Sequence, residues 1–139
     1  MSLVVLDASA ALAWIVPGQS TTAAWRLLDM SGATDFTAPY LFRVEVRNAL
    51  LKLERRGRCS TEDTERGLDL LDALNIAISP PPPASQEHVL MAFARANVLS
   101  FYDAYYVDLA QRRSAALASR DTALLDAAGT RAVTTMDLR

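Results

Sequence analysis

Short apolar runs alternate with longer amphipathic stretches along most of the chain. An apolar run of about four to eight residues bounded by turn residues predicts a strand, and the first such run is Leu3-Val4-Val5-Leu6. Further runs follow at intervals that leave room for a helix between them. Five segments are predicted to be strands: residues 3–6, 35–38, 76–78, 115–118 and 131–134.

The amphipathic stretches carry the start and stop signals of helices. Pro39 suits the first turn of a helix, and apolar residues then recur at helical spacing until Gly57. The segment 60–63 has the spacing of a capping box, and Ser100 can cap a helix that begins at Phe101. Helices are predicted over residues 7–15, 22–30, 39–57, 60–74, 84–96, 101–113 and 121–129.

Strands that alternate with helices predict an α/β fold in which a short parallel sheet is covered by helices on both faces. We therefore expect three layers of structure. The length of 139 residues suits a single domain that spans residues 1–139. In open sheets of this type, ligands bind beyond the carboxyl ends of the strands.

Composition narrows the class of protein. A hydrophobic share of 51% supports a core, and the chain, with a net charge of −2, has no broad basic tract of the kind that dominates non-specific nucleic-acid binding. Cys59 is the only cysteine and His88 the only histidine, so neither a disulfide framework nor a zinc site is expected. The apolar N-terminal run is interrupted by Asp7 and no stretch is long enough to span a membrane, so we expect a cytoplasmic protein.

Four acidic residues fall where this fold would bring them together. Asp7 follows the first predicted strand and Asp121 follows the fourth, whereas Glu45 and Asp103 lie in the opening turns of two helices. Carboxylates that converge repel each other unless a cation lies among them. The usual partner is a hard divalent ion such as Mg²⁺, which can activate water against phosphate esters.

Each acid also has a purely structural explanation. Asp7 and Asp121 suit helix N-caps, and Asp103 has the spacing of a capping box with Ser100. Glu45 is harder to explain in this way, because it lies at the edge of an apolar helix face. No arginine stands at the spacing that would place it beside Glu45 on the helix. Asn48, three residues after Glu45, has that spacing and could hydrogen-bond to Glu45.

The chain resembles the PIN-domain ribonucleases, and most of all the VapC-type toxins of bacterial toxin–antitoxin pairs. The matching segments appear in the family's order: Val4-Val5-Leu6-Asp7-Ala8-Ser9, Ala38-Pro39 with Glu45-Val46-Arg47-Asn48-Ala49-Leu50, Ser100-Phe101-Tyr102-Asp103-Ala104, and Leu117-Ala118-Ser119-Arg120-Asp121. The family's acidic quartet falls on Asp7, Glu45, Asp103 and Asp121, and its small hydroxyl residues fall on Ser9 and Ser119. Family members often have Thr at the position of Ser119.

The resemblance implies metal-dependent hydrolysis of RNA. Asp7, Asp103 and Asp121 would hold Mg²⁺ or Mn²⁺, partly through water, and Glu45 would orient or deprotonate the attacking water. A supporting shell of polar groups would position the carboxylates, comprising Ser9, Asn48 and Ser119. The resemblance also implies an antitoxin protein that blocks the site, and a homodimer. The candidate phosphate contacts are Arg43, Arg47, Arg112 and Arg113.

Other functions compete with this interpretation. A receiver domain needs a lysine late in the chain, and the only lysine is Lys52. A haloacid-dehalogenase-like phosphatase needs an Asp two residues after the first, where this chain has Ser9. A catalytically silent PIN scaffold and a PIN nuclease of RNA processing outside toxin–antitoxin systems stay open. The sequence identifies neither the RNA, its cleavage position, the antitoxin nor the number of metal ions.

Overall fold

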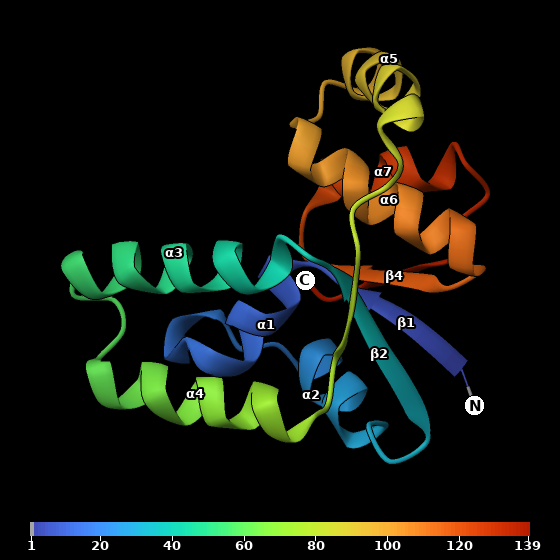
Figure 1. The fold of residues 1–139 in the computed structure, drawn as a ribbon. Coiled ribbons are helices and arrows are strands. Elements are labelled where there is room, and N and C mark those ends of the chain that lie inside the picture. Colours follow the sequence, from blue (N-terminus) through green and yellow to red (C-terminus); the bar gives the residue numbers. More distant parts are fainter. Residues whose placement is uncertain (1) are drawn as a thin grey trace.

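A five-stranded parallel sheet forms the centre of the computed structural model, which describes residues 2–139 (Figure 1). The strand order is β3-β2-β1-β4-β5, and every neighbouring pair is parallel. The strands are β1 (Ser2–Leu6), β2 (Thr34–Pro39), β3 (Ala77–Ser79), β4 (Ala116–Ser119) and β5 (Thr135–Asp137). The middle strand is apolar because it is covered on both faces, and Val5 and Leu6 are fully buried.

In residues 2–139, seven α-helices and two short 3₁₀ turns connect and cover the strands. In Figure 1, α5, α6 and α7 lie on one side of the sheet and α1 and α2 on the other, while α3 and α4 project from it as an antiparallel pair. The helices are α1 (Ala8–Ile15), α2 (Thr22–Asp29), α3 (Phe42–Arg55), α4 (Thr61–Ala73), α5 (Glu87–Asn97), α6 (Phe101–Arg113) and α7 (Thr122–Gly129); the turns are η1 (Pro17–Gln19) and η2 (Ala84–Gln86).

The predicted α/β architecture, with helices on both faces of a short parallel sheet, is confirmed. The capping box at the start of α4 is also present, since Ser60 and Asp63 each bond to the other's backbone N–H. Helix α6 occupies the predicted residues 101–113. Local capping chemistry therefore predicts these helix starts well, because it depends only on residues close in sequence.

Three predicted boundaries differ from the structure by three residues or more. Pro39 is the last residue of β2 and pairs with Ser79, so α3 begins only at Phe42. Helix α5 begins at Glu87, because η2 occupies the three residues before it. The last strand lies at Thr135–Asp137 instead of 131–134, because Ala132 has a positive φ and the Val133 N–H bonds to a carbonyl of α7.

The remaining expectations concern single residues. Cys59 is buried and His88 is exposed, and neither lies among the four acids. The Trp14 indole is buried and donates to the Ala24 carbonyl at 2.8 Å, whereas Trp25 is half exposed. Among residues 2–139, no helix is both long and apolar enough to cross a bilayer.

Candidate active site

Asp7 lies at the carboxyl end of the central strand and is almost completely buried. Its side chain caps α1, because Oδ1 accepts a hydrogen bond from the Ala10 N–H at 3.0 Å. The same oxygen accepts from the Ser9 hydroxyl at 2.7 Å, and Oδ2 accepts from the Ser119 hydroxyl at 2.6 Å. These bonds hold the carboxylate in one orientation at the edge of the sheet.

Ser119 links the ends of two neighbouring strands. It ends β4, is fully buried, and accepts a hydrogen bond from the Asp121 N–H at 2.9 Å while it donates to Asp7. Ser9 has a parallel role, because its hydroxyl donates to Asp7 and accepts from the Arg120 N–H at 2.9 Å. The two serines therefore fix Asp7 relative to the loop that carries Asp121.

Glu45 lies in the first turn of α3, half buried beside α6. Its Oε1 accepts a hydrogen bond from the Tyr106 hydroxyl at 2.8 Å. Tyr106 is only 1% exposed, so packing holds its phenol in place beside Glu45. Sequence analysis missed Tyr106, although it lies three residues after Asp103 and therefore on the same flank of α6.

Asp103 and Asp121 complete the arrangement. Asp103 lies in the first turn of α6, where its N–H donates to the Ser100 hydroxyl at 3.1 Å. Asp121 caps α7, and its Oδ1 accepts from the N–H groups of Ala123 and Leu124. Within residues 2–139, the carboxylate of Asp121 accepts hydrogen bonds only at Oδ1, and that of Glu45 only at Oε1. The second oxygen of each carboxylate is therefore available.

The charges of the four acids act on one another. Burial raises the pKa of Asp7, although its hydroxyl and amide donors oppose the rise, and the charge of Asp103 adds to it. Burial also raises the pKa of Glu45, against the Tyr106 hydrogen bond, and the charges of Asp103 and Asp7 raise it further. The pKa of Asp103 is raised by burial and then by the charge of Asp121. All four predicted acids are thus brought into one electrostatic cluster, which we call the carboxylate cluster.

The donor set of this cluster suits a hard divalent cation, because every candidate ligand is a carboxylate oxygen and a cation would relieve the repulsion. In the part of the chain that the structure describes, no three His, Cys, Asp or Glu side chains form an arrangement that could hold a metal by themselves. Both oxygens of Asp7 accept hydrogen bonds from serine hydroxyls, so an ion there would be held only partly by protein oxygens. Mg²⁺ fits such an open set because it retains several of its own waters.

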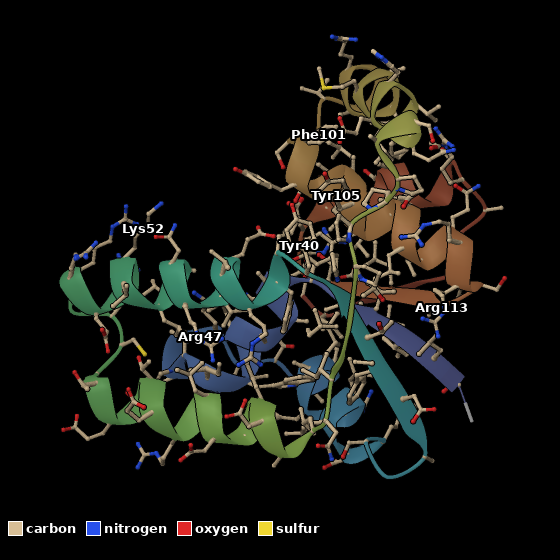
Figure 2. The ribbon with its side chains drawn as sticks, viewed as in Figure 1. Tyr40, Arg47, Lys52, Phe101, Tyr105 and Arg113 are labelled. Carbon is tan, nitrogen blue, oxygen red and sulfur yellow. The ribbon has the colours of Figure 1, made fainter. Side chains whose placement is uncertain are left out.

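In residues 2–139, neither Asn48 nor any of the four candidate arginines forms a hydrogen bond or ion pair with one of the four acids. Asn48 is exposed on α3, and the hydrogen bond to Glu45 comes from Tyr106 instead. Figure 2 shows Arg47 on the side of α3 that faces α4, and Arg113 at the far end of α6. Ion pairs engage Arg43 with Asp72 and Arg112 with Asp108.

Comparison with known proteins gives matches over almost the whole chain. A family model described as the PIN domain matches residues 4–130. No curated protein sequence gives a significant match. Among solved structures, PAE2754 from Pyrobaculum aerophilum is 25% identical, with a TM-score of 0.70 over 97% of this chain and 90% of its own.

Two structures of lower sequence identity bear on the fold alone. FitAcB from Neisseria gonorrhoeae is 18% identical, with a TM-score of 0.64 and 96% of each chain covered. VapBC2 from Rickettsia felis, in a structure with a DNA fragment of its promoter, is 10% identical, with a TM-score of 0.71 and 99% of each chain covered. The parallel sheet and its helices are therefore shared over nearly the full length of all three structures.

Proposed function

The chain belongs to the PIN-domain family, whose members are generally nucleases, and from this premise we propose that it is a metal-dependent endoribonuclease. One observation carries the proposal. Asp7, Glu45, Asp103 and Asp121 come from four separate segments of the sequence, yet their charges form one cluster at the carboxyl edge of the sheet. This is the edge at which parallel sheets bind their ligands.

The proposed roles follow from the surroundings of each acid. Asp7, Asp103 and Asp121 would hold Mg²⁺ or Mn²⁺, partly through water. Such an ion lowers the pKa of a bound water and stabilises the charge that develops on a phosphate. Ser9 and Ser119 keep Asp7 in its orientation by donating to its two oxygens.

Glu45 would orient the attacking water or accept its proton. Its Oε1 is engaged by Tyr106, which leaves Oε2 for that task. The raised pKa of Glu45 makes it a better proton acceptor than an ordinary carboxylate would be. Hydrolysis then breaks the bond from phosphorus to the leaving oxygen, while the water oxygen forms the new bond.

We further propose that the protein is the toxin of a type II toxin–antitoxin system, with a cognate antitoxin that covers the site and a homodimer as its assembly. The motifs that resemble VapC-type toxins support this assignment, and so do the fold-level matches to VapBC2 and FitAcB. A small open reading frame next to the gene would favour the toxin over a PIN nuclease of RNA processing. Light scattering of the purified protein tests the dimer.

The decisive experiment is cleavage of a mixed RNA pool with Mg²⁺ or Mn²⁺, compared with EDTA. Asp103→Asn and Asp7→Asn should each lower the rate at least about a hundredfold, because each removes a charge that the cation requires. Asp103→Asn is the cleaner variant, since Asp7 is buried among hydroxyl donors. It should also raise the melting temperature by about 1 to 4 °C, because it relieves repulsion.

Asp108→Asn is the matched control. Asp108 lies on the same helix as Asp103 but pairs with Arg112, so its loss should leave the cleavage rate unchanged. Cleavage by folded Asp103→Asn protein at the wild-type rate would overturn the assignment of the carboxylate cluster. Absence of metal-dependent cleavage by wild-type protein free of any copurified inhibitor would overturn the ribonuclease itself.

A further inference from the structure

A groove of about 480 Å³ lies between the outer face of α3 and the beginning of α6. Its walls include Glu45, Asn48 and Lys52 from α3 and Tyr102 from α6. Glu45 belongs to the carboxylate cluster, and Tyr102 directly precedes Asp103. The groove is therefore continuous with the carboxylate cluster at one end and extends away from it along α3.

Lys52 gives this groove a cation about two helical turns from Glu45. It is the only lysine of the chain and follows Glu45 by seven residues, which is about two helical turns or on the order of 10 Å along the axis. Figure 2 shows Lys52 on the opposite side of α3 from Arg47, the side nearest the beginning of α6. Across residues 2–139, Lys52 makes no ion pair, whereas Arg43 and Arg112 both do.

Tyr102 gives the same groove an aromatic surface. Its side chain is 61% exposed, in contrast to the neighbouring Tyr105 and Tyr106, which are buried. Val44, which is 69% exposed, lies on the α3 wall of the groove. An exposed aromatic ring beside a cation is the combination on which single-stranded nucleic acids bind, since every base has a flat face that can stack. The Asn48 amide adds a donor and an acceptor for a base edge.

We propose that this groove holds the single-stranded RNA segment next to the phosphate that is cut, with Tyr102 stacked on a base and Lys52 against a flanking phosphate. The proposal rests on the ribonuclease function above and assigns its substrate path. With a net charge of −2, the protein has little long-range attraction for RNA. Binding of an unpaired strand therefore depends on short-range contacts in this groove.

The first measurement is fluorescence anisotropy of a labelled single-stranded RNA of mixed sequence, with Mg²⁺ and the inactive Asp103→Asn protein. Tyr102→Leu in that background should weaken binding about tenfold, because leucine keeps an apolar side chain but cannot stack. Tyr102→Phe should bind normally. Lys52→Gln should weaken binding and flatten the slope of log K against log salt by about 0.7, and Lys52→Arg should restore both.

The second measurement is cleavage by otherwise wild-type protein, in which Tyr102→Leu and Lys52→Gln should raise KM about tenfold and change kcat less than about twofold. Arg95→Gln, which removes a surface cation on α5, is the control and should change neither constant. Unchanged binding in Tyr102→Leu and Lys52→Gln, or equal losses in Tyr102→Leu and Tyr102→Phe, would overturn the groove assignment. Groove-dependent binding without cleavage by wild-type protein would support the groove and overturn only the nuclease.

Discussion

Glu45 depends on a single neighbour that lies 61 residues further along the chain. The Tyr106 hydroxyl donates to Glu45 Oε1, and this bond favours the ionised carboxylate while burial and the nearby acids disfavour it. Burial, and after it the charge and hydrogen bond of Glu45, raise the pKa of Tyr106 well above its ordinary value, so the phenol stays protonated and keeps donating. Tyr106 is therefore a positioning residue that acts through Glu45.

Tyr106→Phe should raise the pKa of Glu45, because it removes a donor that stabilises the charged form. If cleavage needs ionised Glu45, the variant should lose activity at a higher pH than the wild type as the solution is acidified. At slightly acidic pH we expect cleavage to fall by about tenfold to a hundredfold. The measurement is the pH profile of kcat/KM in both proteins.

Tyr105→Phe provides the comparison for this profile. Tyr105 is the adjacent tyrosine, and its ring packs against Tyr40 and Phe101 instead of a carboxylate (Figure 2). Its pH profile should match that of the wild type. A Tyr106→Phe profile that falls in height without moving along the pH axis would contradict the link to Glu45.

At the same scale, the sequence named the four acids that the fold brings together, but not Tyr106, which donates to one of them. Asp7 follows an apolar run directly and Asp121 follows another after Ser119 and Arg120, and that order is readable without a structure. Their capping role does not exclude chemistry, because Asp121 caps α7 with one oxygen and leaves the other available. Tyr106 reaches Glu45 through a contact between α6 and α3, which helical spacing alone does not specify.

At the scale of the elements, the predictable parts were those governed by local chemistry. Capping residues placed the starts of α4 and α6 correctly. The last strand was misplaced because Thr135–Asp137 is short and polar, and its position is set by pairing with β4. Pro39 was taken for a helix start because its role as the end of β2 depends on pairing with β3, at Ser79. Strand ends at a sheet edge depend on partners far away in sequence.

The packing of α4 against α1 gives a prediction at this scale. Gly67 is buried in α4, and a Cβ added there would lie 2.8 Å from the Ile15 Cβ, which cannot move without α1. Gly67→Ala should therefore destabilise the fold by about 1–3 kcal/mol, although alanine is the better helix former. The measurement is urea unfolding followed by circular dichroism.

Gly129→Ala tests whether helix propensity alone can explain the result. Gly129 ends α7, and an added Cβ there meets nothing within 4 Å. This variant should be neutral or up to about 1 kcal/mol more stable than the wild type. A stabilised Gly67→Ala protein would show that α1 and α4 are not packed as closely as the structure places them.

At the scale of the whole molecule, the carboxylate cluster sets how stability depends on pH. The pKa values of Asp7, Glu45 and Asp103 are raised in the folded protein, so the folded state holds protons that the unfolded chain has already lost. Stability from these groups is complete at low pH and is lost as pH rises from about 4 through their folded pKa values. The pKa of Asp137 is lowered to about 2, so its contribution to stability is lost as pH falls below about 4.

Divalent metal should reverse this loss, because a cation that binds only the folded state stabilises it by mass action. In EDTA, the melting temperature of the wild-type protein should fall by several degrees between about pH 5 and pH 8. Mg²⁺ should restore most of that fall at pH 8, where the carboxylates are most fully ionised, and very little at pH 5. Asp103→Asn should show both a shallower fall in EDTA and a smaller response to Mg²⁺, whereas Asp108→Asn should follow the wild type. If Mg²⁺ stabilises wild-type and Asp103→Asn protein equally, the ion binds elsewhere, and the repulsion among these four acids is not what the cation relieves.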